Sequence, residues 1–208
     1  MSERPIFLFA AMVLDCTAAT DSSGATLCDA VARRIDVRGV QVTRDSAASR
    51  GAFEDALADA LSGQRWGAVI ASDRALIRAT DAEREVPALA RRLAARRWAE
   101  PPPELVFLDI DHIGRTGPPT AEAAGDSVVA LLLWRGVRCV VAPAGAVDPA
   151  AAEHFVSVFF EALGVDGLSA EGALHRARSL NRLAHPKATA WAVYQAWGDP
   201  DWRLPGAE

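Results

Sequence analysis

The sequence predicts an α/β fold, a three-layer sandwich in which helices cover both faces of a mostly parallel sheet. The first observation is a set of short apolar runs, such as Leu105–Leu108 and Val137–Ala142, which are typical of strands buried on both faces. The second is that segments with helical spacing of apolar residues lie between these runs. Each connection is long enough to return the chain to the same edge of the sheet, which favours parallel strands.

In the first half, apolar runs predict the strands, and apolar residues at every third or fourth position predict the helices. Ser49 is a suitable N-cap and Gly63 a suitable end for the second helix, and Pro101–Pro103 stops the third. The expected order is strand Ile6–Leu14, helix Ala25–Ile35, strand Gly39–Thr43, helix Ser49–Gly63, strand Trp66–Ala71, and a helix through Val86, Leu89 and Leu93 that reaches about Trp98.

The second half continues the alternation and carries clearer helix start signals. Asp148 followed by Pro149 is a strong N-cap signal, and Ser169 opens the last helix. The segment after Ser127 is apolar on nearly every side, so it should be a buried helix. The expected order is strand Leu105–Leu108, loop Gly114–Pro119, helix Val128–Trp134, strand Val137–Ala142, a helix from Asp148 to Gly164, a helix from Ser169 to about Leu183, and strand Ala190–Gln195.

The composition indicates a single globular domain over residues 1–208. Half of the residues are hydrophobic, which is enough for a proper core. The formal net charge is -5, so the charge balance does not favour nucleic acid as a partner. Protein or small-molecule partners are favoured, although four arginines cluster locally at Arg91, Arg92, Arg96 and Arg97.

The sequence also predicts a cytoplasmic setting, with no membrane span, metal or cofactor. No apolar run reaches the roughly 18–20 residues of a membrane span, and the N-terminus has no signal-peptide cleavage site. The cysteines, Cys16, Cys28 and Cys139, are odd in number and are not spaced like metal ligands. Cys139 lies in a predicted buried strand, where cysteine acts as a small hydrophobe.

The main candidates for chemistry follow the central strand. Asp109, Asp111 and His112 come directly after Leu105–Leu108, and ligands of open α/β sheets collect beyond the carboxyl ends of the strands. The simpler interpretation is a polar strand end, in which the carboxylates accept backbone N–H bonds of the loop.

Three segments of the second half resemble the CHAT domain, a bacterial branch of the caspase-like cysteine peptidases. They are Pro103–Gly114, Gly136–Asp148 and Trp191–Leu204, so the resemblance is strongest over residues 103–204. Over residues 5–75 it rests on the order of elements and on Ser49–Ala71. The resemblance implies a caspase-like fold, with a His/Cys dyad at the ends of the third and fourth strands.

The dyad itself is missing from this chain. Where the family reads Leu-Val-Phe-Leu-Asn-Ala/Cys-Cys-His, this chain reads Leu-Val-Phe-Leu-Asp-Ile-Asp-His, which puts Asp111 at the nucleophile position. The family's histidine is expected after the third strand, where Ser72 and Asp73 stand, and no histidine precedes His112. Because thiolate attack needs a sulfur and a nearby base, the resemblance implies a pseudo-peptidase that binds proteins. The implied setting is a bacterial defence or regulated-proteolysis system, with an active peptidase or a sensor as partner.

Two other functions stay open. One is an active caspase-like peptidase that uses a dyad not recognised in the sequence. The other is a magnesium-dependent phosphohydrolase, because Phe107–His112 also resembles the Asp-x-Asp motif of the haloacid dehalogenases and two such carboxylates can share a hard cation. Asp109 and Asp111 would hold the metal, and Lys187 is the only candidate for the lysine which that family needs.

Two tryptophans flank a Gly-Asp-Pro turn near the end of the chain. Asp199 is expected to organise this turn. Core packing is the simpler role for Trp197 and Trp202, and an aromatic patch for partner binding is the alternative.

Overall fold

The computed structural model describes residues 10–16, 31, 41–47, 49–62, 67–73, 76, 80–98, 101–114 and 127–205. Six strands form one sheet in the order β2-β1-β3-β4-β5-β6. Strands β1 to β5 are parallel, and β6 runs antiparallel to β5. The strands are β1 (Ala10–Cys16), β2 (Gln41–Ala47), β3 (Ala68–Ser72), β4 (Leu105–Asp109), β5 (Cys139–Pro143) and β6 (Tyr194–Gly198).

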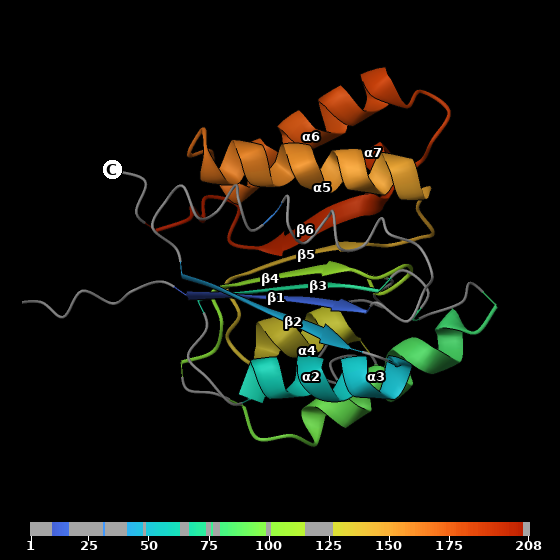
Figure 1. Ribbon diagram of the computed structural model, residues 1–208, viewed down its shortest axis with the longest axis vertical. Coiled ribbons are helices and arrows are strands. Elements are labelled where there is room, and N and C mark those ends of the chain that lie inside the picture. Colours follow the sequence, from blue (N-terminus) through green and yellow to red (C-terminus); the bar gives the residue numbers. More distant parts are fainter. Residues whose placement is uncertain are drawn as a thin grey trace, which may run out of the picture.

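Helices cover both faces of this sheet, which confirms the expected α/β class (Figure 1). Helices α5 and α6 lie on one side of the sheet, and α2, α3 and α4 lie on the other. The helices are α2 (Arg50–Ser62), α3 (Ala82–Ala94), α4 (Val128–Trp134), α5 (Pro149–Gly164), α6 (Ala170–Ala184) and α7 (Ala190–Val193).

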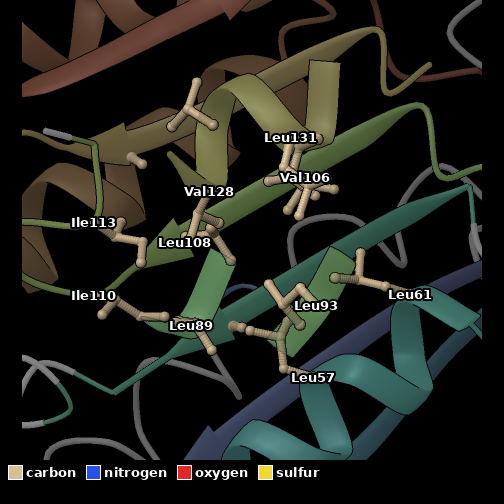
Figure 2. Packing of buried hydrophobic residues seen from close by; sticks show 14 of the residues in the cluster. Leu57, Leu61, Leu89, Leu93, Val106, Leu108, Ile110, Ile113, Val128 and Leu131 are labelled. Carbon is tan, nitrogen blue, oxygen red and sulfur yellow. The ribbon is translucent and has the colours of Figure 1, made fainter. Parts of the chain in front are cut away.

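The central strand β4 contributes side chains to both halves of the core, because successive side chains point to opposite faces of the sheet. Leu105 and Phe107 point to the cluster under α5 and α6. Val106 and Leu108 point to the cluster under α2, α3 and α4, where Figure 2 shows them beside Leu89 and Leu131. All five residues of β4 are buried, including Asp109.

The helix starts agree with the capping residues in the sequence. The Ser127 side chain accepts a hydrogen bond from Ala130 N at 3.2 Å, and Asp148 accepts one from Ala151 N at 3.1 Å. Ser169 accepts from Gly172 N at 3.3 Å. These bonds satisfy backbone donors that would otherwise lack a partner in the first turn.

The end of the chain differs from the expectation. The predicted strand Ala190–Gln195 is wrong over its first four residues, because Ala190–Val193 forms the short helix α7. The strand β6 begins only at Tyr194, which is opposite Pro143 at the end of β5. Val193 and Trp191 favour strands by propensity, but pairing with β5 decides where the strand begins.

One other boundary and one expected burial were also wrong. Helix α3 ends at Ala94 rather than near Trp98, whose indole Nε1 donates to Leu93 O at 3.1 Å. Helix α4 is not buried on every side, since Trp134 at its last position is 68% exposed. The guanidinium of Arg135 lies 5.2 Å from the centre of a Trp134 ring.

Some expectations fall outside the described residues. Of the helix expected over Ala25–Ile35, only Val31 is described, and it is helical and buried. The loop that follows Gly114 is not described, and neither is Cys28. In the part of the chain that is described, no helix combines the length and apolarity needed to cross a membrane.

Two members of the arginine cluster pair with acids of a neighbouring helix. Arg92 on α3 lies 2.8 Å from a Glu54 oxygen on α2, and Arg96 lies 2.9 Å from an Asp55 oxygen. These contacts give both arginines a structural role between α2 and α3.

Candidate functional site

The carboxyl ends of β3 and β4 bring Ser72 and Asp73, where the family's histidine is expected, next to Asp109. Ser72 is opposite Asp109 in the parallel register of the two strands. The backbone N–H of Asp73 donates to the backbone oxygen of Asp109 at 3.1 Å. The structure therefore places Ser72, Asp73 and Asp109 side by side, as the order of the strands predicts.

The Asp109 side chain is buried, with 1% of its surface exposed. Ser72 Oγ donates to Asp109 Oδ2 at 3.0 Å, and the hydroxyl of Tyr194 donates to Asp109 Oδ1. A buried carboxyl group is costly unless it is hydrogen-bonded. These two hydroxyl donors account for how Asp109 is accommodated inside the sheet.

Tyr194 reaches this position from β6, the antiparallel strand on the far side of β5. Its ring stacks on Phe155 of α5, with centroids 4.1 Å apart and planes 7° apart. Its backbone oxygen accepts a hydrogen bond from Arg178 Nη2 at 2.6 Å. The Tyr194 hydroxyl is thus fixed by packing on one helix and by a hydrogen bond from another. We call Ser72, Asp109 and Tyr194 the strand-end cluster.

Asp111 and His112 lie in a turn that is joined to the loop after β5. Asp111 Oδ1 accepts from Val147 N at 3.3 Å, and His112 N donates to Gly145 O at 3.3 Å. Gly114 N donates to Pro143 O at 2.9 Å. The expected role of a loop carboxylate that accepts a backbone N–H bond is confirmed for Asp111.

The backbone of this turn has an unusual conformation and is closely packed. His112 has a φ of +64°, in the left-handed region that few non-glycine residues adopt. A Cβ atom at Gly114 would lie 2.8 Å from the Trp197 ring and 3.0 Å from Pro143 O. The close packing explains why a glycine ends the turn.

The cysteine thiols give no described nucleophile at this edge. Cys139 lies inside β5, and burial raises the pKa of its thiol to about 12. At neutral pH it is therefore protonated and unreactive, which confirms its expected structural role. Cys16 is the last residue of β1, and its side chain lies outside the described part of the structure.

Three further histidines lie on the α5 and α6 side of the molecule. His154 and His185 have ring centroids 5.3 Å apart, and His154 Nδ1 is 3.4 Å from Asn181 Nδ2. Burial, and then the neighbouring His185, lower the pKa of His154. His175 is exposed on α6.

The residues of the phosphohydrolase interpretation are arranged differently from a metal site. Asp109 is enclosed by two hydroxyl donors, and Asp111 accepts a backbone N–H. Lys187 is exposed in the turn after α6. Among the described residues, no group of three or more His, Cys, Asp or Glu side chains could hold a metal ion.

The alternative prediction of an exposed aromatic patch for partner binding is wrong for Trp202. Trp202 is 2% exposed, and its indole nitrogen donates to Glu104 Oε2 at 2.9 Å. Asp199 does organise the turn, because its Oδ1 accepts from Asp201 N at 3.0 Å.

Sequence reasoning missed Tyr194 and Arg178. Tyr194 is the only tyrosine in the chain, and this was the one available signal for a special role. Arg178 lies among several charged residues of α6 and carries no such signal.

The strand-end cluster fixes strands rather than presenting a reactive group. Ser72 is hydrogen-bonded to a carboxyl group, whereas the serine of a catalytic triad is hydrogen-bonded to an imidazole. Ser72 is also only 7% exposed. In chemical terms the cluster ties β3, β4 and β6 together.

No model of a known protein family matches the chain, and no curated protein matches it either.

Proposed function

We propose that this chain is a pseudo-peptidase of the caspase-like CHAT type, which keeps the fold to bind a protein partner and does not cleave it. The observation that carries the proposal is that the polar side chains at the expected dyad positions are already engaged. Ser72 donates to Asp109, and Asp111 accepts from Val147 N, so both hold neighbouring strands and loops together.

The arrangement of the strands supports the caspase-like part of the proposal. The resemblance requires the ends of the third and fourth strands to be neighbours, since its histidine and cysteine act on one bond. Here β3 and β4 are adjacent and in register at Ser72 and Asp109. This agreement is the reason to prefer a member of that clan with a lost dyad.

The chemistry supports the pseudoenzyme part. Peptide hydrolysis through a thiolate needs a sulfur nucleophile and a base within hydrogen-bond reach. Asp111 stands at the nucleophile position and accepts the backbone N–H of Val147. A carboxylate in that place cannot form the thioester that such a peptidase requires.

The test is cleavage of a proteome-derived peptide mixture by the purified chain, read by mass spectrometry. The expected result is the same peptide pattern with and without the protein. New termini that depend on the native chain, and that vanish in Asp111→Asn or His112→Ala, would overturn the proposal.

A further inference from the structure

Strand β6 forms an open edge of the sheet in the described part of the chain. Ala144 N donates to Val193 O at 2.9 Å, and Asp199 N donates to Arg138 O at 2.7 Å. In an antiparallel pair, the residues that bond to the partner alternate with residues that face away. Because Val193 and Asp199 bond to the β5 side, Tyr194, Ala196 and Gly198 turn their backbone groups to the open side.

Two of these three residues offer backbone groups to a further strand. The Tyr194 N–H donates to Ala190 O, and the Tyr194 oxygen accepts from Arg178. Among the described residues, no partner bonds the outward N–H and C=O groups of Ala196 and Gly198. Such an edge is a template for one more strand.

A groove runs along this edge, and α6 forms its other wall. Its volume is about 300 Å³, and its lining comprises Gln195–Pro200 on the strand side and Glu171, Leu174 and Arg178 on α6. Arg178 bonds to Tyr194, and Glu171 N donates to Pro200 O at 3.1 Å. The strand wall therefore runs antiparallel to α6. The helix contributes about 10 Å from Glu171 to Arg178, and β6 contributes about 13 Å from Tyr194 to Gly198.

Arg178 gives the groove a positive charge near its Tyr194 end. Its Nε is buried and has no partner among the described residues, and none of them supplies a carboxylate to the guanidinium. Burial lowers the pKa of Arg178, but an arginine side chain stays charged at neutral pH. The guanidinium still has donors that a carboxylate could accept.

We propose that this groove binds an extended peptide segment of a partner protein, which adds to the sheet beside β6 and places an acidic side chain on Arg178. Main-chain bonds to Ala196 and Gly198 provide affinity, and the carboxylate at Arg178 provides specificity. The inference rests on the proposed function only in taking protein binding as the task of the chain. It gives that task a surface distinct from the strand-end cluster.

The position of α6 along the groove favours a single extended segment over a second copy of this chain. In a second copy, Arg178 would tie α6 to β6 as it does here. A β6 that entered the groove would bring its own α6 against the α6 already forming the wall. A peptide without such a helix needs only the space along the edge.

The experiment is selection of displayed random peptides of about seven residues, roughly 23 Å when extended, on the purified full chain. The expected result is enrichment of strand-forming residues around one fixed Asp or Glu. A fluorescent synthetic copy of the enriched peptide then gives the affinity. Hydrogen exchange at the Ala196 and Gly198 amides is expected to slow when it binds.

Matched variants locate the contact. Arg178→Gln should weaken binding about tenfold or more, as should replacing the acid of the peptide by its amide, and the two losses should not add. Arg178→Lys should keep part of the affinity. Ala196→Pro removes an outward N–H without breaking a bond to β5, so it should abolish binding in a folded protein. Arg182→Gln, on an exposed residue of the same helix, should leave binding unchanged.

Three results would overturn the inference: no enriched acidic position, binding that Arg178→Gln and Ala196→Pro leave intact, or a dimer in sedimentation that Ala196→Pro abolishes. The last would assign the edge to a second copy. Mass spectrometry of the same peptides after incubation separates the two proposals. Cleavage would contradict the pseudo-peptidase while leaving the groove in place, and absence of binding without cleavage would contradict the groove alone.

Discussion

The Asp111 carboxyl group accepts a hydrogen bond from the backbone N–H of buried Val147. Asp111→Ala leaves that N–H without this acceptor and should cost about 1–3 kcal/mol of unfolding free energy. Asp111→Asn keeps an oxygen in place and should cost clearly less. Urea unfolding of both variants measures the difference, and equal losses would show that this bond does not matter.

The Cys139 thiol should be inert in the folded protein, because burial raises its pKa to about 12 and only a thiolate reacts rapidly. Iodoacetamide treatment at neutral pH, followed by peptide mapping, should find Cys139 unmodified. Prior unfolding in urea should make it fully reactive. Rapid modification of Cys139 in the native protein would contradict its burial in β5.

His154 should make the stability depend on pH. Its folded-state pKa is lowered, first by burial and then by His185, so the unfolded chain binds the proton more readily just below the ordinary value of about 6.5. Stability is then present above that value and is lost as the pH falls toward the folded-state pKa. The effect should be small, because His154 is only half-buried.

Urea midpoints at about pH 7.5 and about pH 5.5 measure this dependence. His154→Gln should reduce the loss at the lower pH, whereas His175→Gln, on an exposed residue of α6, should not. An unchanged loss in His154→Gln would assign the dependence to other groups.

At the scale of elements, Gly198 fixes how β6 leaves the sheet. Its φ is +98°, and a Cβ atom there would lie 2.1 Å from Arg138 O. Gly198→Ala should therefore cost more than the about 1–3 kcal/mol of a strained backbone position alone. A Cβ atom at Gly51 on α2 would meet no atom within 4 Å, so Gly51→Ala should stabilise the protein slightly.

Thermal unfolding of the two glycine variants gives the comparison. A Gly198→Ala protein as stable as the unchanged chain would contradict the close approach of β6 to Arg138.

The elements that could be predicted from the sequence are those with local signals. Asp148 and Ser169 mark the starts of α5 and α6 because capping depends on a few neighbouring residues. The start of β6 depends instead on the pairing of Tyr194 with Pro143. The α7 turn at Ala190–Val193 has no comparable local signal, so its residues were predicted as strand.

At the scale of the whole molecule, the sequence placed two parts of the strand-end cluster but missed the third. Ser72 and Asp109 end strands that order alone makes neighbours. Tyr194 is 85 residues from Asp109 in the chain, and it reaches Asp109 only because β6 folds back antiparallel to β5. Such a contact depends on the assembled sheet.

The cluster and the groove are linked through one residue. The hydroxyl of Tyr194 donates to Asp109, and its backbone oxygen accepts from Arg178 at the groove. Tyr194 thus connects the sheet ends of β3 and β4 to the edge where we expect a peptide to bind. The same strand that closes the core also presents the proposed binding edge.

The central claim is that the Asp109 carboxyl group holds strands together, and a double-mutant cycle with Tyr194 tests it most directly. Tyr194→Phe should cost about 1–3 kcal/mol of unfolding free energy in the unchanged chain, because buried Asp109 Oδ1 loses a donor. In an Asp109→Leu background the same change should cost little. Equal costs in the two backgrounds, within about 0.5 kcal/mol, would contradict the claim.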